Sequence, residues 1–554
     1  MVRMRIFERI AVAIALTVFS QPAGPAEGPT SEPASGAATS GEPREAVEMH
    51  VPQGADLQSF IDRARPGDVL LLEPGATYVG NFMLPALPPQ PSGIPAQFIT
   101  IRSAADASHF PADDRVGPEH AEWMPILRSP NTGSALATRP GAHHWRLHWL
   151  AFQANARGEG NIISLGDGSR AQNDLATVPH HFELDGLIIR GDAAQGQKRG
   201  IGLNSAATVI RNSDIREIKY VGQDSQAICG WNGPGPYVIE GNYLEASGEN
   251  IMFGGADPAI PNLVPTDITI RRNYVTKPLE WRASDSRWTV KNLLELKNAR
   301  RVLIESNVFE HNWVAAQAGY ALLFKPVNQD GRAPWSDVSD ITFQFNIVRH
   351  VSSAINILGT DYRYPSQHMR GLQIRHNLFY DVSGSRWGGD GRFLTIGDGP
   401  RDIVVDHNTV LQTGSILALY GTREGRPWVV QNFHFTNNLT LHNQYGISGD
   451  SAGFGKSAIA RYLDREDIRR NVLAGADPSR YPADNLFPSV DELMAEFVDS
   501  ANDDYRLRPA SRFSQAATDG SALGANVEAI RRRFPDGDRP SPPKRESDSR
   551  LPKP

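Results

Sequence analysis

The 554-residue sequence is poor in the features that mark several large protein classes. It has one cysteine, Cys229, so one chain forms no internal disulfide and its stability must come from packing and hydrogen bonds. We expect Cys229 to be a small buried residue and not a nucleophile, because no activating partner is evident near it. The formal net charge of -6 argues against a general nucleic-acid-binding protein, since such proteins are normally basic.

Long hydrophobic runs are also missing. The N-terminal run, residues 10–19, is too short to span the ~30 Å apolar core of a bilayer. It follows several arginines and precedes small residues at Ala23 and Ala26, a pattern typical of a secretory signal peptide over residues 1–26. We therefore expect a secreted or periplasmic protein without a membrane span.

Two segments contain few large apolar residues. Residues 27–48 are rich in Pro, Ala, Gly, Ser and Glu, and residues 535–554 are rich in proline and charge. These compositions predict a disordered linker and a disordered tail. Between them, residues 49–534 are predicted to form one folded domain.

An eight-residue phrase recurs through this domain. Each copy is an alternating apolar strand that ends in asparagine and an apolar residue, as in ITIRRNYV, VLIESNVF, ITFQFNIV and LQIRHNLF. The alternation with period 2 and the Val, Ile and Phe content indicate strands, and a repeat of 30 to 39 residues is typical of a solenoid. The sequence therefore predicts an all-β fold, a parallel β-helix with two or three short strands per coil.

The repeated asparagines have a predicted structural role. Successive coils stack ~4.8 Å apart, so an inward asparagine can hydrogen-bond to its equivalents above and below. We assign eight positions to this role: Asn212, Asn242, Asn273, Asn307, Asn346, Asn377, Asn408 and Asn438.

A second strand recurs before each asparagine phrase, as in NLLELK and ALLFKP. The insertions between coils are rich in tryptophan, and we expect these long loops to wall a binding cleft on one face. Their tryptophans are Trp281, Trp288, Trp313, Trp335 and Trp387. Because open coil edges invite association, residues 57–64 are predicted to form a capping helix, and residues near 504–526 to close the other end.

The phrase ARPGDVLLLEPGATYVGNF (residues 64–82) resembles the N-terminal cap of pectin-lyase-like proteins. With the asparagine coils, the resemblance spans about residues 50–525. It implies a right-handed parallel β-helix with an N-terminal cap and long loops on one face. That superfamily contains polysaccharide lyases, glycoside hydrolases, epimerases and non-catalytic surface proteins, so the fold alone does not fix the function.

Residues 295–312, ELKNARRVLIESNVFEHN, resemble the alginate lyase and chondroitinase B family. This resemblance implies that Lys297 is the catalytic base, that Lys325 stands where the family has an arginine, and that Glu295 orients a lysine or binds a cation. It also implies calcium as a cofactor, although Asn292 stands where the family has an acidic ligand. For calcium, the sequence further offers Glu249 and Asp257, which flank NIMFGG.

The predicted chemistry is β-elimination on a uronic acid. We expect Lys297 and Lys325 to lie roughly 5 Å apart on adjacent coils, where mutual repulsion would lower the pKa of one of them. Residues 271–301 contain nine Lys or Arg and three acidic residues, which favours a basic cleft for an anionic polymer. The candidate substrate-binding residues are Arg282, Arg300, Asp361, Asp398, Trp313 and Trp335.

Three functions remain open. The first is a polysaccharide lyase for uronic-acid polymers, and the second is a glycoside hydrolase using two carboxylates such as Asp361 and Asp398. The third is a non-catalytic protein that binds polysaccharide. In each case we expect a monomer whose partner is an anionic polysaccharide and not a nucleic acid.

Overall fold

The computed structural model describes residues 45–88, 96–283 and 285–534. The predicted signal peptide, residues 27–44 of the predicted linker and the predicted tail lie outside these ranges. The chain divides into two units between Glu45 and Ala46, and the fold below is that of the second unit. Its first strand begins at Glu48, the last residue of the predicted linker.

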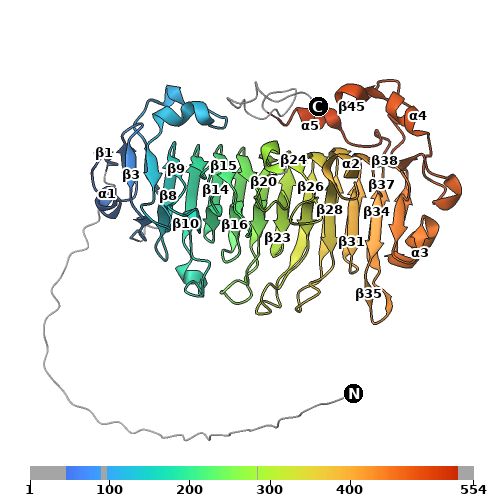
Figure 1. Cartoon of the computed structure of the whole chain (residues 1–554), viewed down its shortest axis with the longest axis horizontal. Coiled ribbons are helices and arrows are strands. Elements are labelled where there is room, and N and C mark those ends of the chain that lie inside the picture. The colour runs from blue at the N-terminus through green and yellow to red at the C-terminus, as the bar shows by residue number, and fades with distance from the viewer. Residues whose placement is uncertain (1–44, 89–95, 284, 535–554) are drawn as a thin grey trace, which may run out of the picture. The chain divides into compact units, whose positions relative to one another are not determined.

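The domain is a right-handed parallel β-helix, which confirms the predicted fold (Figure 1). Each coil adds one strand to each of three parallel sheets, so strands three apart in the chain are neighbours. We call the sheets A, B and C. Sheet A contains β1 (Glu48–Val51), β2 (Val69–Leu72), β5 (Ile99–Ser103), β8 (His143–His148), β11 (His180–Asp185), β14 (Ala206–Arg211), β17 (Gly235–Glu240), β20 (Thr266–Arg271), β23 (Ala299–Glu305), β26 (Val338–Gln344), β29 (Arg370–Arg375), β32 (Arg401–Asp406), β37 (Val430–Thr436), β41 (Leu463–Asp464) and β42 (Asp467–Arg469).

Sheets B and C complete each coil. Sheet B contains β3 (Thr77–Val79), β6 (Ile126–Arg128), β9 (Ala151–Gln153), β12 (Ile188–Arg190), β15 (Asp214–Ile218), β18 (Tyr243–Ala246), β21 (Tyr274–Thr276), β24 (Val308–Asn312), β27 (Ile347–Val351), β30 (Leu378–Val382), β33 (Thr409–Gln412), β38 (Leu439–Leu441) and β43 (Val472–Ala474). Sheet C contains β4 (Phe82–Leu84), β7 (Leu136–Thr138), β10 (Asn161–Leu165), β13 (Arg199–Leu203), β16 (Gln226–Gly230), β19 (Glu249–Phe253), β22 (Leu294–Leu296), β25 (Tyr320–Phe324), β28 (Ser353–Leu358), β31 (Leu394–Gly397), β34 (Leu417–Tyr420), β39 (Ile447–Gly449) and β40 (Gly453–Phe454).

The core lies inside the coils and follows from the alternation seen in the sequence. In β23, Val302 and Ile304 are buried while Leu303 between them is partly exposed. The strand register stacks Val302 on Ile268 of the preceding coil and on Ile341 of the following coil. Like residues therefore form continuous apolar columns along the stack, and every coil buries its neighbour.

The asparagine ladder lies at the corner between sheets A and B. From Asn242 to Asn438, each side-chain Nδ2 donates to the Oδ1 of the next ladder asparagine at 2.9–3.1 Å. The backbone N–H of each donates to the same oxygen. This confirms seven of the eight predicted positions, and the ladder continues through Asn471 to Asn485.

The eighth prediction, Asn212, is wrong by one residue. Ser213 occupies the ladder position, and its backbone N–H donates to Asn242 Oδ1 at 3.0 Å. Asn212 lies in the preceding position, where the backbone turns with a φ of 52°. The same left-handed bend precedes later ladder residues, for example at Arg272 and Ser306, and it turns the chain from sheet A into sheet B.

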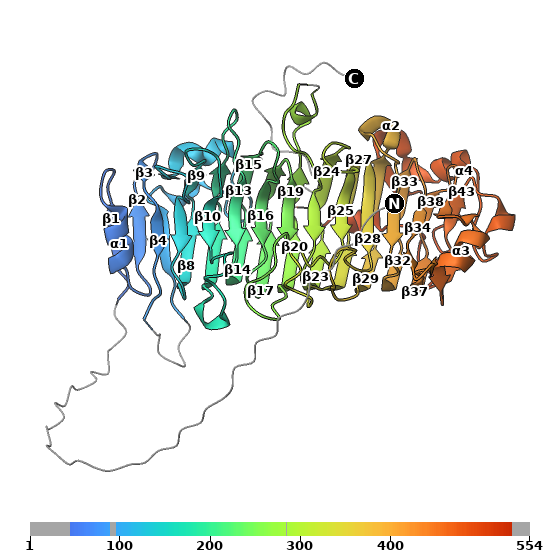
Figure 2. The same ribbon diagram turned by 60° about the horizontal axis from the view of Figure 1, so that its bottom comes forward.

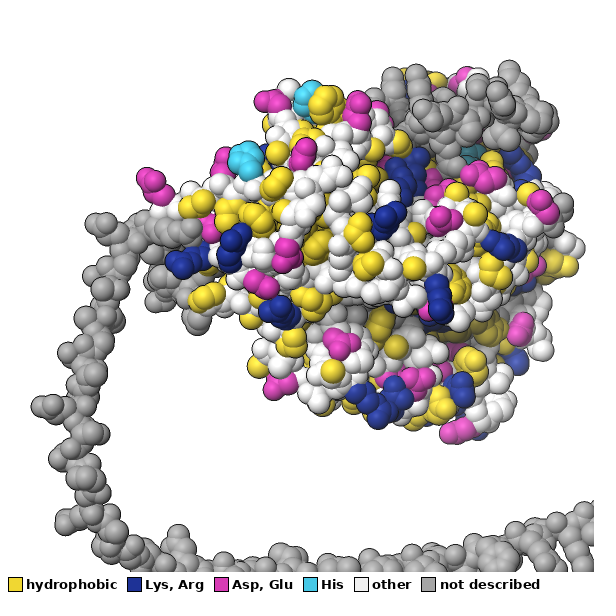
Figure 3. Space-filling view, turned by 60° about the vertical axis from the view of Figure 1, so that its left-hand side comes forward, with side chains coloured by type: hydrophobic (Ala, Val, Ile, Leu, Met, Phe, Trp, Pro, Cys, Tyr) yellow, Lys and Arg dark blue, Asp and Glu magenta, His cyan; other side chains and the backbone are white. Residues whose placement is uncertain are grey.

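Both ends of the stack are capped. Helix α1 (Leu57–Arg63) covers the first coil, as predicted, and buries Leu57 and Ile61. Figure 3 views this end and shows charged side chains of both signs interspersed with apolar ones. The other end carries α3 (Lys456–Tyr462). The chain then folds back along the outer face of sheet B through α4 (Val490–Ala495), the hairpin of β44 (Phe497–Asp499) and β45 (Asp504–Leu507), and α5 (Val527–Arg531) (Figure 1). Residues 504–526, which were predicted to close the end of the stack, therefore cover a side of it instead.

Loops leave the stack at both edges of sheet C (Figure 2). They contain the short helices η3 (Leu175–Thr177), η4 (Leu279–Arg282) and α2 (Gly384–Trp387), and the hairpin of β35 (Thr422–Arg423) and β36 (Arg426–Pro427). The helices η1 (Ala107–His109) and η2 (Pro118–Trp123) lie in the loop from sheet A to sheet B, and η5 (Pro478–Arg480) and η6 (Ser500–Asn502) follow the last coil. Among the described residues, no helix has the length and hydrophobicity needed to cross a membrane.

Candidate active site

The outward face of sheet C gathers the candidate catalytic residues. In β22, the inward side chains are Leu294 and Leu296, so Glu295 between them points outward. The register aligns Glu295 with Met252 of the preceding coil and Leu323 of the following coil. Loops rise at both edges of this row of strands, and the candidate site lies between them.

Lys297 and Lys325 come together over Glu295. Their ammonium groups lie 3.6 Å and 3.3 Å, respectively, from the same oxygen, Glu295 Oε1. The lysine side chains are 13% and 24% exposed, whereas the side chain of Glu295 is fully buried. The structure thus holds two ammonium groups on the outer face of sheet C and their shared counter-ion beneath them.

The predicted lowering of a lysine pKa is wrong for Lys297. Burial does lower the pKa of Lys297, but the nearby carboxylates of Glu295, Glu249 and Asp224 outweigh burial and raise it overall. The sequence argument considered repulsion between the two lysines and missed the acidic side chains of neighbouring coils. Lys297 therefore carries a proton at neutral pH in the structure as it stands.

A second acid–base group lies one coil earlier. Glu249 begins β19 and is fully buried, and Gln226 Nε2 donates to its Oε2 at 2.9 Å. Lys291 approaches Glu249 Oε1 at 3.6 Å and pairs with Asp224 at 2.5 Å. The pKa of Glu249 is raised, first by burial and then by the charges of Glu295 and Asp224.

Three buried oxygen atoms in this group accept no hydrogen bond: Glu249 Oε1, Asn292 Oδ1 and Glu295 Oε1. Asn292 is one residue beyond Lys291 and donates to the other oxygen of Glu295 at 3.0 Å. Two carboxylates and an amide carbonyl are oxygen donors of the kind that calcium takes. By donor type these residues fit a calcium ion, with Asn292 in place of the second acidic ligand. An ion here would share Glu249 Oε1 and Glu295 Oε1 with the lysine ammonium groups, which lie 3.3–3.6 Å from them.

Asp257, the other predicted calcium ligand, is not near Glu249. Glu249 is the first residue of β19, whereas Asp257 lies beyond the other end of that strand. Asp257 Oδ2 accepts hydrogen bonds from the backbone N–H groups of Asp330 and Arg332 at 3.1 and 2.9 Å. The structure thus gives Asp257 a loop-bracing role, because an extended strand separates residues that the sequence only shows as near neighbours.

The predicted basic cleft does not form as expected, because strand alternation and loops disperse its nine cations. Arg300 lies on sheet A and pairs with Asp337 at 3.0 Å, and Arg301 beside it pairs with Asp267 at 2.7 Å. Lys277 is buried, and its ammonium donates to four oxygens of residues Ala246, Gly248, Asn250 and Asn292. From this stretch, Lys291 and Lys297 approach the acidic cluster on sheet C.

Four of the five loop tryptophans pack together at the edge where sheet B leads into sheet C. Trp281, Trp288, Trp313 and Trp387 form one apolar cluster, which lines a hollow of about 350 Å³. The guanidinium of Arg282 lies 4.8 Å from the ring centre of Trp387. Trp335 is elsewhere, in the loop after β25, where its Nε1 donates to Leu263 O at 3.1 Å.

Asp361 and Asp398 share a hollow of about 820 Å³ in the loops after β28 and β31, with Trp428 and the exposed Tyr362. Burial raises the pKa of Asp398. Asp361 accepts hydrogen bonds from the backbone N–H groups of Asn328 and Arg363. The structure therefore brings both predicted carboxylates into one hollow, separate in the chain from Lys297.

The sequence interpretation missed several neighbours of the site. Asp224, Gln226 and Lys291 surround Glu249, and Tyr320 begins the next strand with its hydroxyl 2.6 Å from Thr395 Oγ1. Their position on the stack was recoverable, since each begins or precedes a strand of sheet C. Cys229 is buried as predicted, and burial raises the pKa of its thiol to about 11.

Comparison with known proteins supports the fold. No model of a known protein family matches the sequence, and no curated protein matches it. Among solved structures, the PL6 family alginate lyase AlyGC is 14% identical, with a TM-score of 0.52 over 91% of this chain and 60% of the lyase. The chain thus spans 60% of the length of that lyase.

Two further solved structures, a lyase and a polygalacturonase, are also similar to the chain. A mannuronic acid-specific family 6 lyase from the human gut microbiota is 11% identical, with a TM-score of 0.44 over 80% of this chain and 91% of the lyase. A family 28 exopolygalacturonase from Yersinia enterocolitica is 11% identical, with a TM-score of 0.38 over 80% and 78%. At 14% identity, the similarity to AlyGC supports the parallel β-helix fold alone, and the chemistry must be argued from the residues themselves.

Proposed function

We propose that this protein is an exported carbohydrate-active enzyme, a polysaccharide lyase that cleaves uronic-acid polymers by β-elimination. The observation that carries the proposal is the pair Lys297 and Lys325, held on adjacent coils by one buried carboxylate in the loop-walled face of sheet C. A signal-like N-terminus supports export, because such a segment directs a chain out of the cytoplasm.

β-Elimination needs three tasks, and the residues of this face can divide them. The uronate carboxylate must be neutralised, the C5 proton removed and the leaving oxygen protonated. Lys297 in its neutral form takes the C5 proton, the electron pair forms the C4–C5 double bond, and the C4–O bond breaks. Lys325, which is more exposed, gives its proton to the leaving oxygen.

The proton on Lys297 must first be lost, and the acidic cluster controls that step. Glu249, Asn292 and Glu295 would hold a calcium ion through the oxygens that accept no hydrogen bond. When bound, calcium would supply positive charge that offsets these carboxylates and the carboxylate of the substrate. With its carboxylate partners compensated, Lys297 would be governed by burial, which lowers its pKa.

The test is an ultraviolet assay for the unsaturated product on alginate, pectate, chondroitin and heparin-like polymers, each with calcium and with chelator. We expect product from a uronic-acid polymer, and a loss of about 10²–10⁴-fold in Lys297→Ala and in Lys325→Ala. The matched control is Arg301→Ala, which removes a cation from the same coil on sheet A and should keep full activity. Folded protein without product on every polymer, or full activity in Lys297→Ala, contradicts the proposal.

A second candidate is a glycoside hydrolase at the hollow of Asp361 and Asp398. The observation that favours it is the raised pKa of Asp398, which suits a general acid, beside a second carboxylate and two aromatic rings. A hydrolase would release reducing ends without an ultraviolet-absorbing product. Its activity would be lost in Asp398→Asn and kept in Lys297→Ala, whereas the lyase gives the opposite result.

A further inference from the structure

Four histidines gather on sheet A, away from the residues used above. The sequence repeats a His-His-aromatic phrase, at residues 143–145 and again at residues 180–182. These phrases begin β8 and β11, neighbouring strands whose register aligns His143 with His180. His144 and His181 both have a left-handed backbone, with φ of 56° and 58°, so the two pairs present their rings in the same way.

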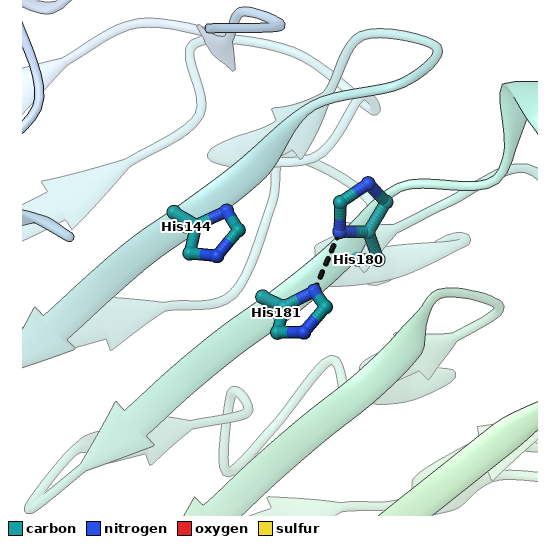
Figure 4. Close-up of side chains that lie close together, drawn as sticks. All are labelled: His144, His180 and His181. Atoms are coloured by element: carbon teal, nitrogen blue, oxygen red, sulfur yellow. Dashed lines mark hydrogen bonds between the residues drawn. The ribbon is translucent and has the colours of Figure 1, made fainter. Parts of the chain in front are cut away.

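The rings form a compact cluster (Figure 4). His143 stacks on His180, and His144 stacks on His181, with ring centres 5.0 and 4.6 Å apart. His180 Nδ1 lies 2.6 Å from His181 Nδ1, the contact drawn as a dashed line in Figure 4. His144, His180 and His181 each offer a ring nitrogen within 4.8 Å of those of the other two.

We propose that His144, His180 and His181 bind one divalent transition-metal ion, and that zinc is a suitable probe of the site. Imidazole nitrogen is a common ligand of zinc, copper and nickel. Zinc–nitrogen bonds of about 2.0–2.1 Å place two ligands of a tetrahedral site roughly 3.4 Å apart. The nitrogens lie within 4.8 Å of one another, so the nearly parallel rings of His144 and His181 would rotate to direct their lone pairs at one ion, and water or His143 would complete the four ligands.

The four rings lie in a crowded, partly buried setting. The pKa of His144 is lowered to about 4, first by burial and then by the charges of His181, His143 and His180. Burial also lowers the pKa of each of the other three rings. In the described part of the chain, no carboxylate forms an ion pair with these rings. The Nδ1 atoms within each pair hydrogen-bond to each other, so a metal would bind through the other ring nitrogens or replace these contacts.

The site is accessible and independent of the proposed lyase site. His181 is exposed and the other rings are partly exposed, so an ion can enter from solvent. The cluster lies on sheet A in earlier coils, whereas Glu249, Asn292 and Glu295 lie on sheet C or just before its strands. Histidine nitrogens select transition metals, and the oxygen donors of the other site select calcium, so metal identity separates the two.

The experiment uses full-length protein without a polyhistidine tag, stripped with chelator and titrated with zinc by calorimetry. Metal content is then measured by mass spectrometry after gel filtration. We expect one zinc per chain, and at least about tenfold weaker binding in His144→Ala, His180→Ala and His181→Ala. His148→Ala on the same strand and Glu249→Gln at the calcium site are matched controls and should bind zinc as the parent does.

His181→Ala is the decisive variant, because its exposed ring can be removed with little effect on folding. Cobalt substitution gives a second readout, since a tetrahedral nitrogen site gives visible absorption bands without thiolate charge transfer. Absence of stoichiometric zinc from the folded parent overturns the proposal. The proposal is also overturned if the folded His181→Ala and His180→Ala variants bind zinc as tightly as the parent protein does.

Discussion

Two rows of polar side chains run along the same stack of coils, and they differ in how far their hydrogen bonds are satisfied. In the asparagine ladder, the Oδ1 of Asn346 accepts two hydrogen bonds from Asn307, and the pattern repeats at each coil. On sheet C, Glu249 Oε1 and Asn292 Oδ1 are equally buried and accept none. A row of buried polar groups that satisfy one another's hydrogen bonds stabilises the scaffold. A row whose buried oxygens accept no hydrogen bond is a candidate binding site for a ligand.

The two rows also differ in charge. The ladder consists of neutral amides that repeat the same contact, so it needs no partner outside the chain. The sheet C group sets Asp224, Glu249 and Glu295 against three lysines, with the lysine side chains reaching the surface above two fully buried carboxylates. This arrangement concentrates charge where a charged substrate or ion can enter. The comparison therefore distinguishes polar residues that stabilise the fold from polar residues that are suited to binding or catalysis.

The largest predicted effect in this comparison concerns the stability of the ladder. Asn346→Ala removes an acceptor shared by two donors of Asn307 and a donor to Asn377, leaving buried groups unsatisfied. We expect a loss of about 3 kcal/mol in the free energy of unfolding, measured by denaturant unfolding. Asn212→Ala is the matched control and should cost about 1 kcal/mol, mainly because its left-handed backbone favours asparagine over alanine. The Asn212 side chain contributes a single 3.4 Å hydrogen bond, to Asp185.

Equal losses in the two variants would contradict the assignment of the ladder. If Asn212→Ala were the costlier change, the bend before the ladder, and not the ladder itself, would be the main stabilising feature of the corner. A small loss in both would mean that backbone stacking alone holds the coils together.

The sequence predicted the scaffold well for a physical reason. Stacking requires each coil to repeat the types of inward residue found in its neighbour. The contacts that define the fold therefore produce a periodic pattern in the sequence. Asn212 was misassigned because its phrase is one residue out of register with the others, and Ser213 fills the position with a shorter polar side chain. Asn471 and Asn485 were missed because the strand alternation around them is weaker.

The candidate site was harder to predict, because it depends on residues that no repeat relates. Lys297 and Lys325 were found together, since each directly follows a strand of sheet C. The charge state of Lys297 was wrong because Glu249 and Asp224 belong to other coils, and their distances follow from register and loop length. Asp257 does not join Glu249 at the proposed calcium site, because the extended strand β19 separates the two residues in space.

The next effect in size tests the open row with calcium. If Glu249, Asn292 and Glu295 bind calcium in the folded state only, calcium at about 100 times its dissociation constant adds about 2.7 kcal/mol to stability. Thermal unfolding with calcium and with chelator measures this gain. Glu249→Gln and Glu295→Gln should lose most of it, whereas Asp257→Asn, whose parent carboxylate braces a loop, should keep it.

An unchanged melting temperature on calcium addition would show that the lysines alone satisfy the acidic cluster. The open oxygens would then serve the substrate directly, and the ammonium groups of Lys297 and Lys325 would neutralise the uronate.

The smallest effect concerns the pH dependence of the calcium-free protein. The folded-state pKa of Glu249 is raised above its ordinary value of 4.5, first by burial and then by Glu295 and Asp224. The folded chain therefore holds this proton more tightly than the unfolded chain, and the stability that it contributes is lost as pH rises from about 4.5 through the raised pKa. Glu249→Gln stays neutral, so in chelator it should be more stable than the parent above that range, by about 1 kcal/mol.

Thermal unfolding at a series of pH values from about pH 4 to pH 8 gives stability against pH for the parent and for Glu249→Gln, both in chelator. Glu119→Gln, which changes an exposed carboxylate, is the control and should follow the parent. Parallel curves for Glu249→Gln and the parent would mean that Gln226 and Lys291 already satisfy the carboxylate fully. The proposal predicts that the stability advantage of Glu249→Gln over the parent grows with rising pH and disappears or reverses when calcium is added. That result would show that the acidic cluster destabilises the protein without calcium and stabilises it with calcium bound.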